Sequence, residues 1–376
     1  MKIVIAPDSF KESLSAADVC QALAEGVRRV IPQAEIDTCP MADGGEGTVE
    51  AMIASTLGRL IEVDTFGPLG EPRRASFGLL GDGKTAVIEM ASAAGLPLVP
   101  PDRRNPLLTT TFGVGKLIGA ALAAGATELI IGIGGSATTD GGTGCAQALG
   151  VVFIDSSGKP CMCGLAGGGL GSIARIDMAG RDERLAAARI RVACDVTNPL
   201  TGEQGAAAVF GPQKGATPEM VKVLDAGLAN LAACIRRDLG LDVENLPGAG
   251  AAGGLGAGLV AFAGAELQRG VEIVADALQL ARRLSGAAVV LTGEGKLDGQ
   301  SSRGKTAFGV AMIAQRLGVP SICIPGQAAS DAPREAFAHV LPLMANGVTL
   351  AQAMTQTREL LADRAEQAMR KFLNSS

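Results

Sequence analysis

Five short polar clusters follow apolar runs of this sequence, at the points where predicted strands end. Open α/β sheets bind ligands beyond the carboxyl ends of their strands, so side chains that follow strands are candidate binding groups. Any one cluster could be only a turn or a helix cap, but five together indicate a ligand site. The clusters are Asp8–Ser13 (DSFKES), Asp43–Glu46 (DGGE), Gly134–Asp140 (GGSATTD), Asp195–Asn198 (DVTN) and Gly293–Asp298 (GEGKLD).

The groups in these clusters suit phosphoryl transfer. This reaction depends on positioning and charge neutralisation, with amides and lysines for phosphate, carboxylates for Mg²⁺ and one aspartate near the attacking hydroxyl. The glycine loop 132–144 supplies many amides and hydroxyls before a predicted helix at Cys145–Leu149, which is typical of an anion site. Loops 211–215 and 248–256 could bring Lys214 or a backbone amide to a phosphate, or could be simple turns.

The string GQSSRGKT at Gly299–Thr306 fits the Walker A pattern G-x-x-x-x-G-K-[ST]. In a P-loop the first glycine follows directly on a buried strand. Here the polar hexapeptide GEGKLD separates Gly299 from the apolar run Ala287–Thr292, and 52 glycines in 376 residues make chance matches common. A P-loop fold is therefore the weaker interpretation of this string.

A second glycine pattern resembles a dinucleotide fingerprint. Gly132, Gly134 and Ala137 have the G-x-G-x-x-A spacing after a predicted strand, and Asp155 follows at the end of the next strand. Hydride transfer to or from a hydroxyl also needs an acid–base group, usually His, Tyr or Lys. The chain has no Tyr, and its single His, His339, is expected in a helix end with a structural role. An NAD-dependent oxidoreductase is thus a weaker alternative.

Composition limits the partners and the compartment. A net charge of −5, the absence of Trp and Tyr and only ten Phe argue against nucleic-acid binding. The short apolar run before Asp8 predicts neither a signal peptide nor a membrane anchor. The eight cysteines lack the spacing of a disulfide scaffold, and the pair Cys161 and Cys163 has no second pair or histidine for zinc. We expect a cytoplasmic protein with small-molecule partners and no membrane contact.

Strand and helix signals alternate at both ends of the chain, which predicts a parallel sheet. We therefore expect an α/β fold of two α/β domains, one open domain built from both chain ends and a second α/β domain inserted between them. The expected strands are Lys2–Ala6, Glu35–Pro40, Thr85–Met90, Glu128–Ile133, Arg189–Cys194, Ala287–Thr292 and Ser321–Pro325. The expected helices are Val19–Ile31, Thr48–Thr56, Thr306–Leu317 and Thr349–Leu373. A capping box at Ser15–Asp18 precedes the first of these helices.

Taken together, the motifs resemble the bacterial glycerate kinases of the type I family, which phosphorylate the 2-hydroxyl of D-glycerate. The resembling segments include KIVIAPDSFKESLSA, MADGGEGT, GDGKTAVIEMA, RNPLLTTTFGVG, GIGGSATTDGG, VACDVTNPL, GAAAVFGPQKGA, GAAGGLG and TGEGKLDGQS, and they cover residues 1 to about 310. The resemblance implies ATP and Mg²⁺ as cofactors, 2-phosphoglycerate and ADP as products, and a flavodoxin-like parallel-sheet domain. We place that domain at 1–62 and 286–376 and the inserted domain, with its glycine-rich loops, at 63–285. The family has the GEGKLD-like hexapeptide before a Gly-Lys pair, which implies that the Walker-like string belongs to a different fold.

Residue chemistry and the resemblance together suggest roles at the site. Asp195 is the expected base or orienting carboxylate for the glycerate hydroxyl, and Lys11 the expected catalytic lysine that neutralises phosphate or carboxylate. The other expected contacts are Asp8, Ser13, Asp43, Glu46 and Asn198 for the substrate, Gly134, Gly135, Ser136, Thr138, Lys214 and Lys305 for the nucleotide, and Glu294 and Asp298 for Mg²⁺.

Two alternatives stay open at the level of function. The same residues could serve a kinase that forms 3-phosphoglycerate, because the 2- and 3-hydroxyls lie one carbon apart. A non-enzymatic binding protein for a small hydroxy acid would have similar clefts, although it would not need so many phosphate-type loops. The sequence predicts neither the oligomeric state nor a role for the segment after Ser321.

Overall fold

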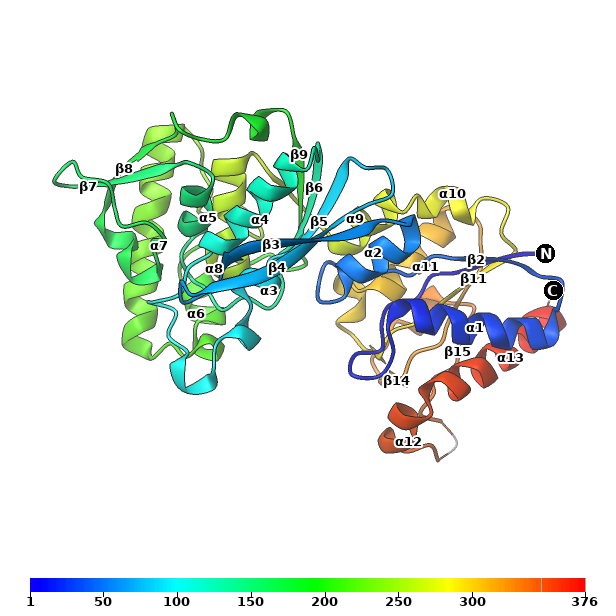
Figure 1. Cartoon of the computed structure of the whole chain (residues 1–376). Coiled ribbons are helices and arrows are strands. Elements are labelled where there is room, and N and C mark those ends of the chain that lie inside the picture. Colours follow the sequence, from blue (N-terminus) through cyan, green and yellow to red (C-terminus); the bar gives the residue numbers. More distant parts are fainter. Residues whose placement is uncertain (346, 376) are drawn as a thin grey trace. The chain divides into compact units, whose positions relative to one another are not determined.

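The computed structural model describes residues 1–345 and 347–375, and the chain divides into two compact units (Figure 1). The terminal unit contains Met1–Asp43, Glu50–Leu57 and Arg269–Ser376, and the inserted unit contains Gly44–Val49 and Gly58–Gln268. The boundaries expected from the sequence, 1–62 and 286–376 around 63–285, stay a prediction about folding domains.

The terminal unit is built on a five-stranded sheet in which all neighbouring strands are parallel. Its strand order is β15-β13-β11-β1-β2, which is the 2-1-3-4-5 order of flavodoxin. The expectation of a flavodoxin-like domain built from both chain ends is therefore confirmed. The strands are β1 (Lys2–Ile5), β2 (Glu35–Thr38), β11 (Val289–Thr292), β13 (Ser321–Cys323) and β15 (His339–Val340).

Helices α1 (Ala16–Val30) and α13 (Thr357–Ser375) lie side by side against this sheet (Figure 1). Ser15 caps α1 by accepting a hydrogen bond from the Asp18 amide at 3.2 Å, as its sequence predicts. Val19, Leu23 and Val27 recur at helical spacing and are buried against β1 and β11. Gly26 meets the Ala362 carbonyl of α13 so closely that a Cβ would clash, which explains glycine in the middle of this helix.

Two predictions in the last part of the chain are wrong. The closing helix expected over Thr349–Leu373 is interrupted at Gln356 and forms α12 (Leu350–Thr355) and α13. The apolar pattern of the two helices continues across this break, so the pattern alone does not show it. His339 lies in β15 rather than at a helix end, because this short strand pairs with β13 and completes the sheet.

The inserted unit contains a six-stranded sheet in the order β10-β9-β6-β5-β4-β3. Its strands are β3 (Arg59–Phe66), β4 (Pro72–Leu79), β5 (Thr85–Glu89), β6 (Glu128–Gly132), β9 (Arg189–Ala193) and β10 (Glu266–Gln268). The sequence predicted β5, β6 and β9 but not the antiparallel pair β3 and β4. Half of the residues of β3 are exposed at the sheet edge, and its sequence lacks the continuous apolar run of a buried strand.

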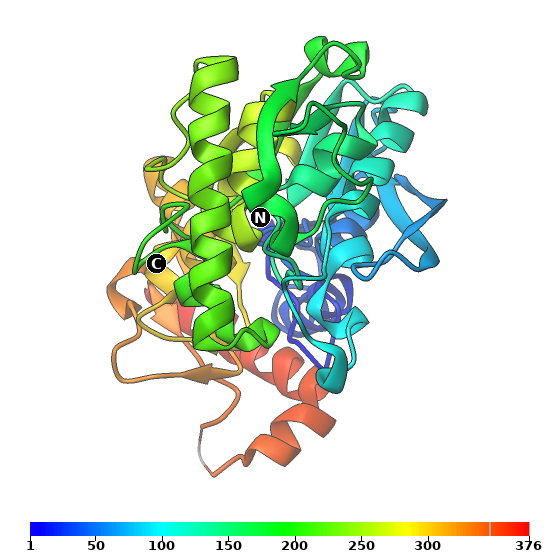
Figure 2. The same ribbon diagram turned by 90° about the vertical axis from the view of Figure 1, so that its left-hand side faces the viewer.

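A second layer of the inserted unit packs on the long helix α7 (Pro218–Leu239), which runs along one side of that unit (Figure 2). Leu224, Leu228 and Leu231 of α7 form a core with Phe153 and Phe262.

The remaining helices are α2 (Thr48–Thr56), α3 (Ala91–Ala94), α4 (Phe112–Ala123), α5 (Thr143–Ala148), α6 (Ala206–Phe210), α8 (Ala251–Gly258), α9 (Gly270–Ala277), α10 (Leu280–Leu284) and α11 (Thr306–Arg316). The short strands are β7 (Val152–Asp155), β8 (Ile173–Asp177), β12 (Lys296–Leu297) and β14 (Gln327–Ala328).

Short 3₁₀ helices connect these elements: η1 (Leu96–Leu98), η2 (Pro101–Arg103), η3 (Gly167–Ser172), η4 (Glu183–Ala186), η5 (Pro212–Lys214), η7 (Ser301–Arg303) and η8 (Arg334–Ala336). A π-helix, η6 (Leu259–Ala263), directly follows α8. Over the residues that the structure describes, no helix combines the length and the apolar character needed to span a bilayer.

Candidate active site

The terminal unit contains a cavity of about 670 Å³ beyond the carboxyl ends of β1 and β11. Successive strands lie on opposite sides of this pair, so it is the switch point at which open α/β sheets bind ligands. Asp8 follows β1 and Glu294 follows β11, and both line the cavity. The Asp8 amide donates to the Gly293 carbonyl at 2.9 Å, which fixes the two loops side by side.

Asp8 and Glu294 are carboxylates with shifted acidity. Burial and the nearby charge of Asp43 raise the pKa of Asp8 to about 6, although its Oδ2 accepts from the Thr306 hydroxyl at 2.5 Å. Burial likewise raises the pKa of Glu294 to about 7, against a hydrogen bond from Ser301 Oγ at 2.7 Å. Carboxylates held in this way favour a proton or a cation near neutral pH.

Lysines line the same cavity. Lys305 Nζ lies 3.1 Å from Asp298 Oδ1, and Lys296 Nζ lies 3.3 Å from Asp298 Oδ2. Burial opposes ionisation of Asp298, but its hydrogen bonds and these charges lower its pKa overall. Lys11 is exposed at the cavity, where no ion pair with another described residue holds it.

The Walker-like string does not form a P-loop. Strand β12 stands between β11 and Gly299, and Lys305 precedes α11 with its ammonium held by Asp298. A P-loop would place the glycine turn directly after the central strand. The sequence argument against a P-loop is therefore confirmed by the order of elements.

Other residues expected at the substrate lie in different settings. Asp43 lines the cavity, whereas Glu46 is exposed in the inserted unit. Ser13 also lines the cavity, but its hydroxyl contacts the Met354 carbonyl at 3.2 Å and the Thr357 hydroxyl. In this structure Ser13 thus ties the loop after β1 to the junction between α12 and α13.

The sequence analysis missed the apolar part of this cavity. Six apolar residues line it, five of them in the last part of the chain, for which the sequence predicted no role. They are Phe10, Leu343, Met344, Leu350, Ala353 and Met354. The signal was available only in part: Leu350, Ala353 and Met354 share one helical face, but nothing in the sequence shows what that face meets.

The acidic residues of this cavity fit Mg²⁺ only together with other ligands. In the described parts of the chain, no three His, Cys, Asp or Glu side chains gather as a ready metal site. Mg²⁺ keeps several waters and is usually held by one or two carboxylates plus substrate phosphates. Glu294 and Asp8 supply oxygen ligands of this kind, whereas Asp298 is engaged by two lysines.

The inserted unit has a second candidate locus, the glycine loop after β6. Gly134 and Gly135 are exposed, and their N–H groups have no acceptor among residues 1–345 and 347–375. Gly135 has a φ of +73°, which favours glycine. Successive amides of this kind can bind an oxyanion.

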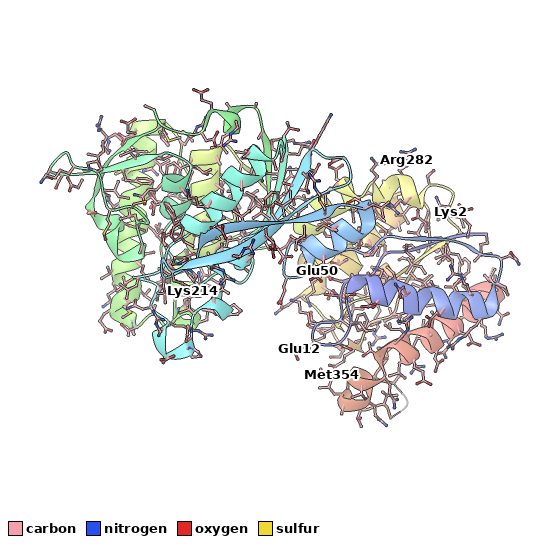
Figure 3. The ribbon with its side chains drawn as sticks, in the orientation of Figure 1. Lys2, Glu12, Glu50, Lys214, Arg282 and Met354 are labelled. Atoms are coloured by element: carbon pink, nitrogen blue, oxygen red, sulfur yellow. The ribbon has the colours of Figure 1, made fainter. Side chains whose placement is uncertain are left out.

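Lys214 lies beneath this loop and is only 2% exposed; Figure 3 labels it among the side chains of the inserted unit. Its Nζ donates to Ser136 Oγ at 2.7 Å and to the Thr138 carbonyl at 2.6 Å. Burial lowers the pKa of Lys214 to about 7, and the charge of Asp140 opposes this shift. The expected nucleotide-binding lysine therefore contacts the loop itself.

Asp140 is the second buried ionisable group under the loop, and no individual role was predicted for it from the sequence. Its carboxylate accepts from the amide and the hydroxyl of Thr111, both at 2.7 Å, and from the amides of Gly142 and Gly144. Gly253 packs against the Thr138 carbonyl, where a Cβ would clash. The hydroxyls of Thr138 and Thr139 are buried without a partner among the described residues, so a bound group could use them.

Asp195 is exposed in the loop after β9, where its sequence predicts it. Asn198 shapes the same loop, because its Nδ2 donates to the Gln204 carbonyl at 2.8 Å and its own carbonyl accepts from Gly250 at 3.0 Å. Asp195 therefore presents a carboxylate at a strand end, and Asn198 supports the backbone beside it.

Comparisons with known proteins agree on one family. The model of the glycerate kinase family matches residues 3–373. Relatives named glycerate 2-kinase in Escherichia coli K12 and glycerate kinase in Bacillus subtilis 168 are each 54% identical over 331 residues, 88% of this chain and 86% of theirs. A glycerate kinase of Halalkalibacterium halodurans is 49% identical over 374 residues, 98% of this chain and 97% of its own. A crystal structure provisionally identified as glycerate kinase 2 of Salmonella typhimurium LT2 has a TM-score of 0.92, 50% identity, and coverage of 100% of this chain and 99% of that one.

Proposed function

Because this chain belongs to the glycerate kinase family, we propose that it transfers the γ-phosphate of ATP to the 2-hydroxyl of D-glycerate, giving 2-phosphoglycerate and ADP. The observation that carries the proposal is the family match over nearly the whole chain. The 2-position is favoured because one of the relatives is named a glycerate 2-kinase. An enzyme with this donor and eight free cysteines would act in the cytoplasm.

Asp195 is the proposed group that orients the glycerate hydroxyl and accepts its proton. Its exposure after β9 supports this role, since a base must reach the substrate. Phosphoryl transfer passes through a loose transition state in most cases, so orientation of the hydroxyl contributes more than its early deprotonation. Asn198 would act on the substrate side by holding this loop in place.

The phosphates of ATP and the carboxylate of glycerate are negatively charged and need hydrogen-bond donors and lysines to neutralise them. We assign the amides of Gly134 and Gly135 and the hydroxyls of Ser136 and Thr138 to oxygens of the transferred phosphate. Lys214 would assist through Ser136 and Thr138, which it already contacts. Lys11 and Lys305, at the terminal-unit cavity, would neutralise further phosphate or carboxylate oxygens.

Mg²⁺ would be held by Glu294 with phosphate oxygens and would neutralise charge on the transferred group. Asp298 becomes a ligand only if Lys296 and Lys305 turn toward phosphate and release it.

The residues proposed to contact the substrate are Asp8, Asp43, Ser13 and Glu46. The raised pKa of Asp8, caused by burial and by Asp43, suits hydrogen bonding to a hydroxyl.

The proposal is tested with the purified chain, ATP, Mg²⁺ and D-glycerate, with ADP release as the readout. We expect ADP release that requires D-glycerate, is much slower with L-glycerate, and stops when EDTA removes the metal. ADP release at the same rate without glycerate would contradict the proposal. Glycerate binding without any turnover would instead favour the hydroxy-acid binding protein.

A further inference from the structure

The cavity of the terminal unit has two chemically different parts. Charged side chains, among them Asp8, Lys11, Glu294 and Lys305, line it together with an apolar set. Two large members of the apolar set are exposed: Leu350 is 60% exposed and Met354 is 39% exposed. Apolar side chains left in contact with water beside a cavity often mark a ligand surface.

One helical face supplies most of this apolar surface. Leu350, Ala353 and Met354 are spaced i, i+3 and i+4 on α12, so they share a face, and all three line the cavity. The helix is fixed at its start by a capping box, in which Thr349 Oγ1 accepts from the Gln352 amide at 3.3 Å and Gln352 Oε1 accepts from the Thr349 amide at 2.9 Å. Leu343 and Met344 extend the same lining.

The apolar face is tied to the charged loop. Ser13, at the end of the loop that begins with Asp8, bonds to the Met354 carbonyl and to the Thr357 hydroxyl. Glu12 and Met354 accordingly lie at the same end of the terminal unit in Figure 3. A ligand that fills the cavity therefore meets carboxylates and lysines on one part of its surface and Leu and Met side chains on another.

The size and the chemistry of this cavity distinguish between glycerate and ATP as its occupant. A cavity of about 670 Å³ is in the range of sites for drug-sized molecules. Glycerate has three carbons, each bearing oxygen, and offers no apolar face to Leu350 or Met354. A nucleoside triphosphate has both a flat ring and a charged chain, and methionine packs well on aromatic rings.

We propose that the α12 face formed by Leu350, Ala353 and Met354, with Leu343 and Met344, binds the adenine ring of ATP. The phosphate chain then extends toward Lys11, Lys305 and Glu294. This inference rests on the proposed function for the choice of nucleotide, and it gives the segment after Ser321 a role in nucleotide recognition.

The test compares nucleotide binding with phosphate binding. In the variant Leu350→Asn/Met354→Gln, the affinity for ADP measured by calorimetry should fall about tenfold or more. A loss of this size is expected even if only one of the two apolar side chains is buried by the bound ring. Affinity for inorganic tripolyphosphate, which has no ring, should change less than twofold. Both replaced side chains are partly exposed, so the melting temperature should stay near that of the wild type.

Two further variants complete the design. Met354→Leu keeps an apolar surface and should retain ADP affinity within about threefold, and Leu317→Asn, at an exposed leucine outside the cavity, should have no effect on ADP affinity. An unchanged ADP affinity in Leu350→Asn/Met354→Gln, or an equal loss for tripolyphosphate, would overturn the inference. Because the readout is binding, a wild-type chain that binds ADP through this face but does not phosphorylate glycerate would contradict the proposed function alone.

Discussion

Glu294 is a buried carboxylate and Asp8 a half-buried one, and both line the candidate site. The pKa of Glu294 is about 7 in the folded protein, whereas it has its ordinary value of 4.5 in the unfolded chain. Between these values the folded state binds more protons, so the free energy of unfolding falls as the pH rises. Such a residue lowers stability at the pH where its charge is useful, which is common at functional sites.

Glu294→Gln should therefore stabilise the metal-free protein, and more so at pH 8 than at pH 5. The glutamine keeps the shape and can still accept from Ser301, but it has no charge to bury. We expect the difference from wild type to grow by on the order of 2 kcal/mol across this range, measured by urea unfolding at each pH. A difference that stays constant with pH would show that Glu294 does not titrate in this window.

Asp195→Asn should lower kcat by about 10²–10⁴ while ATP binding is retained, since the amide cannot take up the hydroxyl proton. The loose transition state of phosphoryl transfer favours the lower end of that range. Asp102→Asn, at an exposed aspartate of the same unit, is the matched control and should be unaffected. A correctly folded Asp195→Asn enzyme with near wild-type kcat would shift the assignment to Asp8 and Asp43.

The glycine loop after β6 is an element whose conformation depends on two buried charges. Lys214 holds Ser136 and the Thr138 carbonyl, and Asp140 gathers Thr111 and the amides of Gly142 and Gly144. Exposed amides can bind phosphate only if the backbone is already in place, because ordering a flexible loop would reduce the affinity. The buried contacts supply this order.

Lys214→Met should reduce the free energy of unfolding by at least about 2 kcal/mol, because it leaves Ser136, the Thr138 carbonyl and Asp140 without the ammonium. Lys159→Met, at an exposed lysine of the same unit, should change it by less than about 0.5 kcal/mol. Urea unfolding measures both. A stable Lys214→Met protein with a raised KM for ATP would mean instead that the lysine meets the nucleotide directly.

At the same scale, the sequence predicted elements well where their signals are local. Ser15 and the spacing of Val19, Leu23 and Val27 identify α1, and continuous apolar runs identify β1, β5, β6 and β11. The exposed strand β3 and the break at Gln356 escaped prediction because pairing and packing with distant residues decide them. The partners of Lys214 were unpredictable for the same reason, since Ser136 is far away in the sequence.

For the whole molecule, the terminal unit depends on both ends of the chain. Strand β1 pairs with the central strand β11, and α1 packs on α13, so neither end can bury its apolar face alone. Alternating strand and helix signals predicted this α/β class, and the five polar clusters predicted the strand ends that carry the candidate site. The apolar lining from α12 was not predicted, because only the folded chain brings it to Asp8 and Glu294.

The position of the transferred phosphate tests the central claim most directly. The purified chain should be incubated with D-glycerate, ATP and Mg²⁺, and the product examined by ³¹P and ¹H NMR at early times. We predict a phosphorus signal coupled to the single proton on C2, which identifies 2-phosphoglycerate, with one equivalent of ADP formed. A signal coupled to the two protons on C3, or no phosphorylated glycerate at all, would contradict the account.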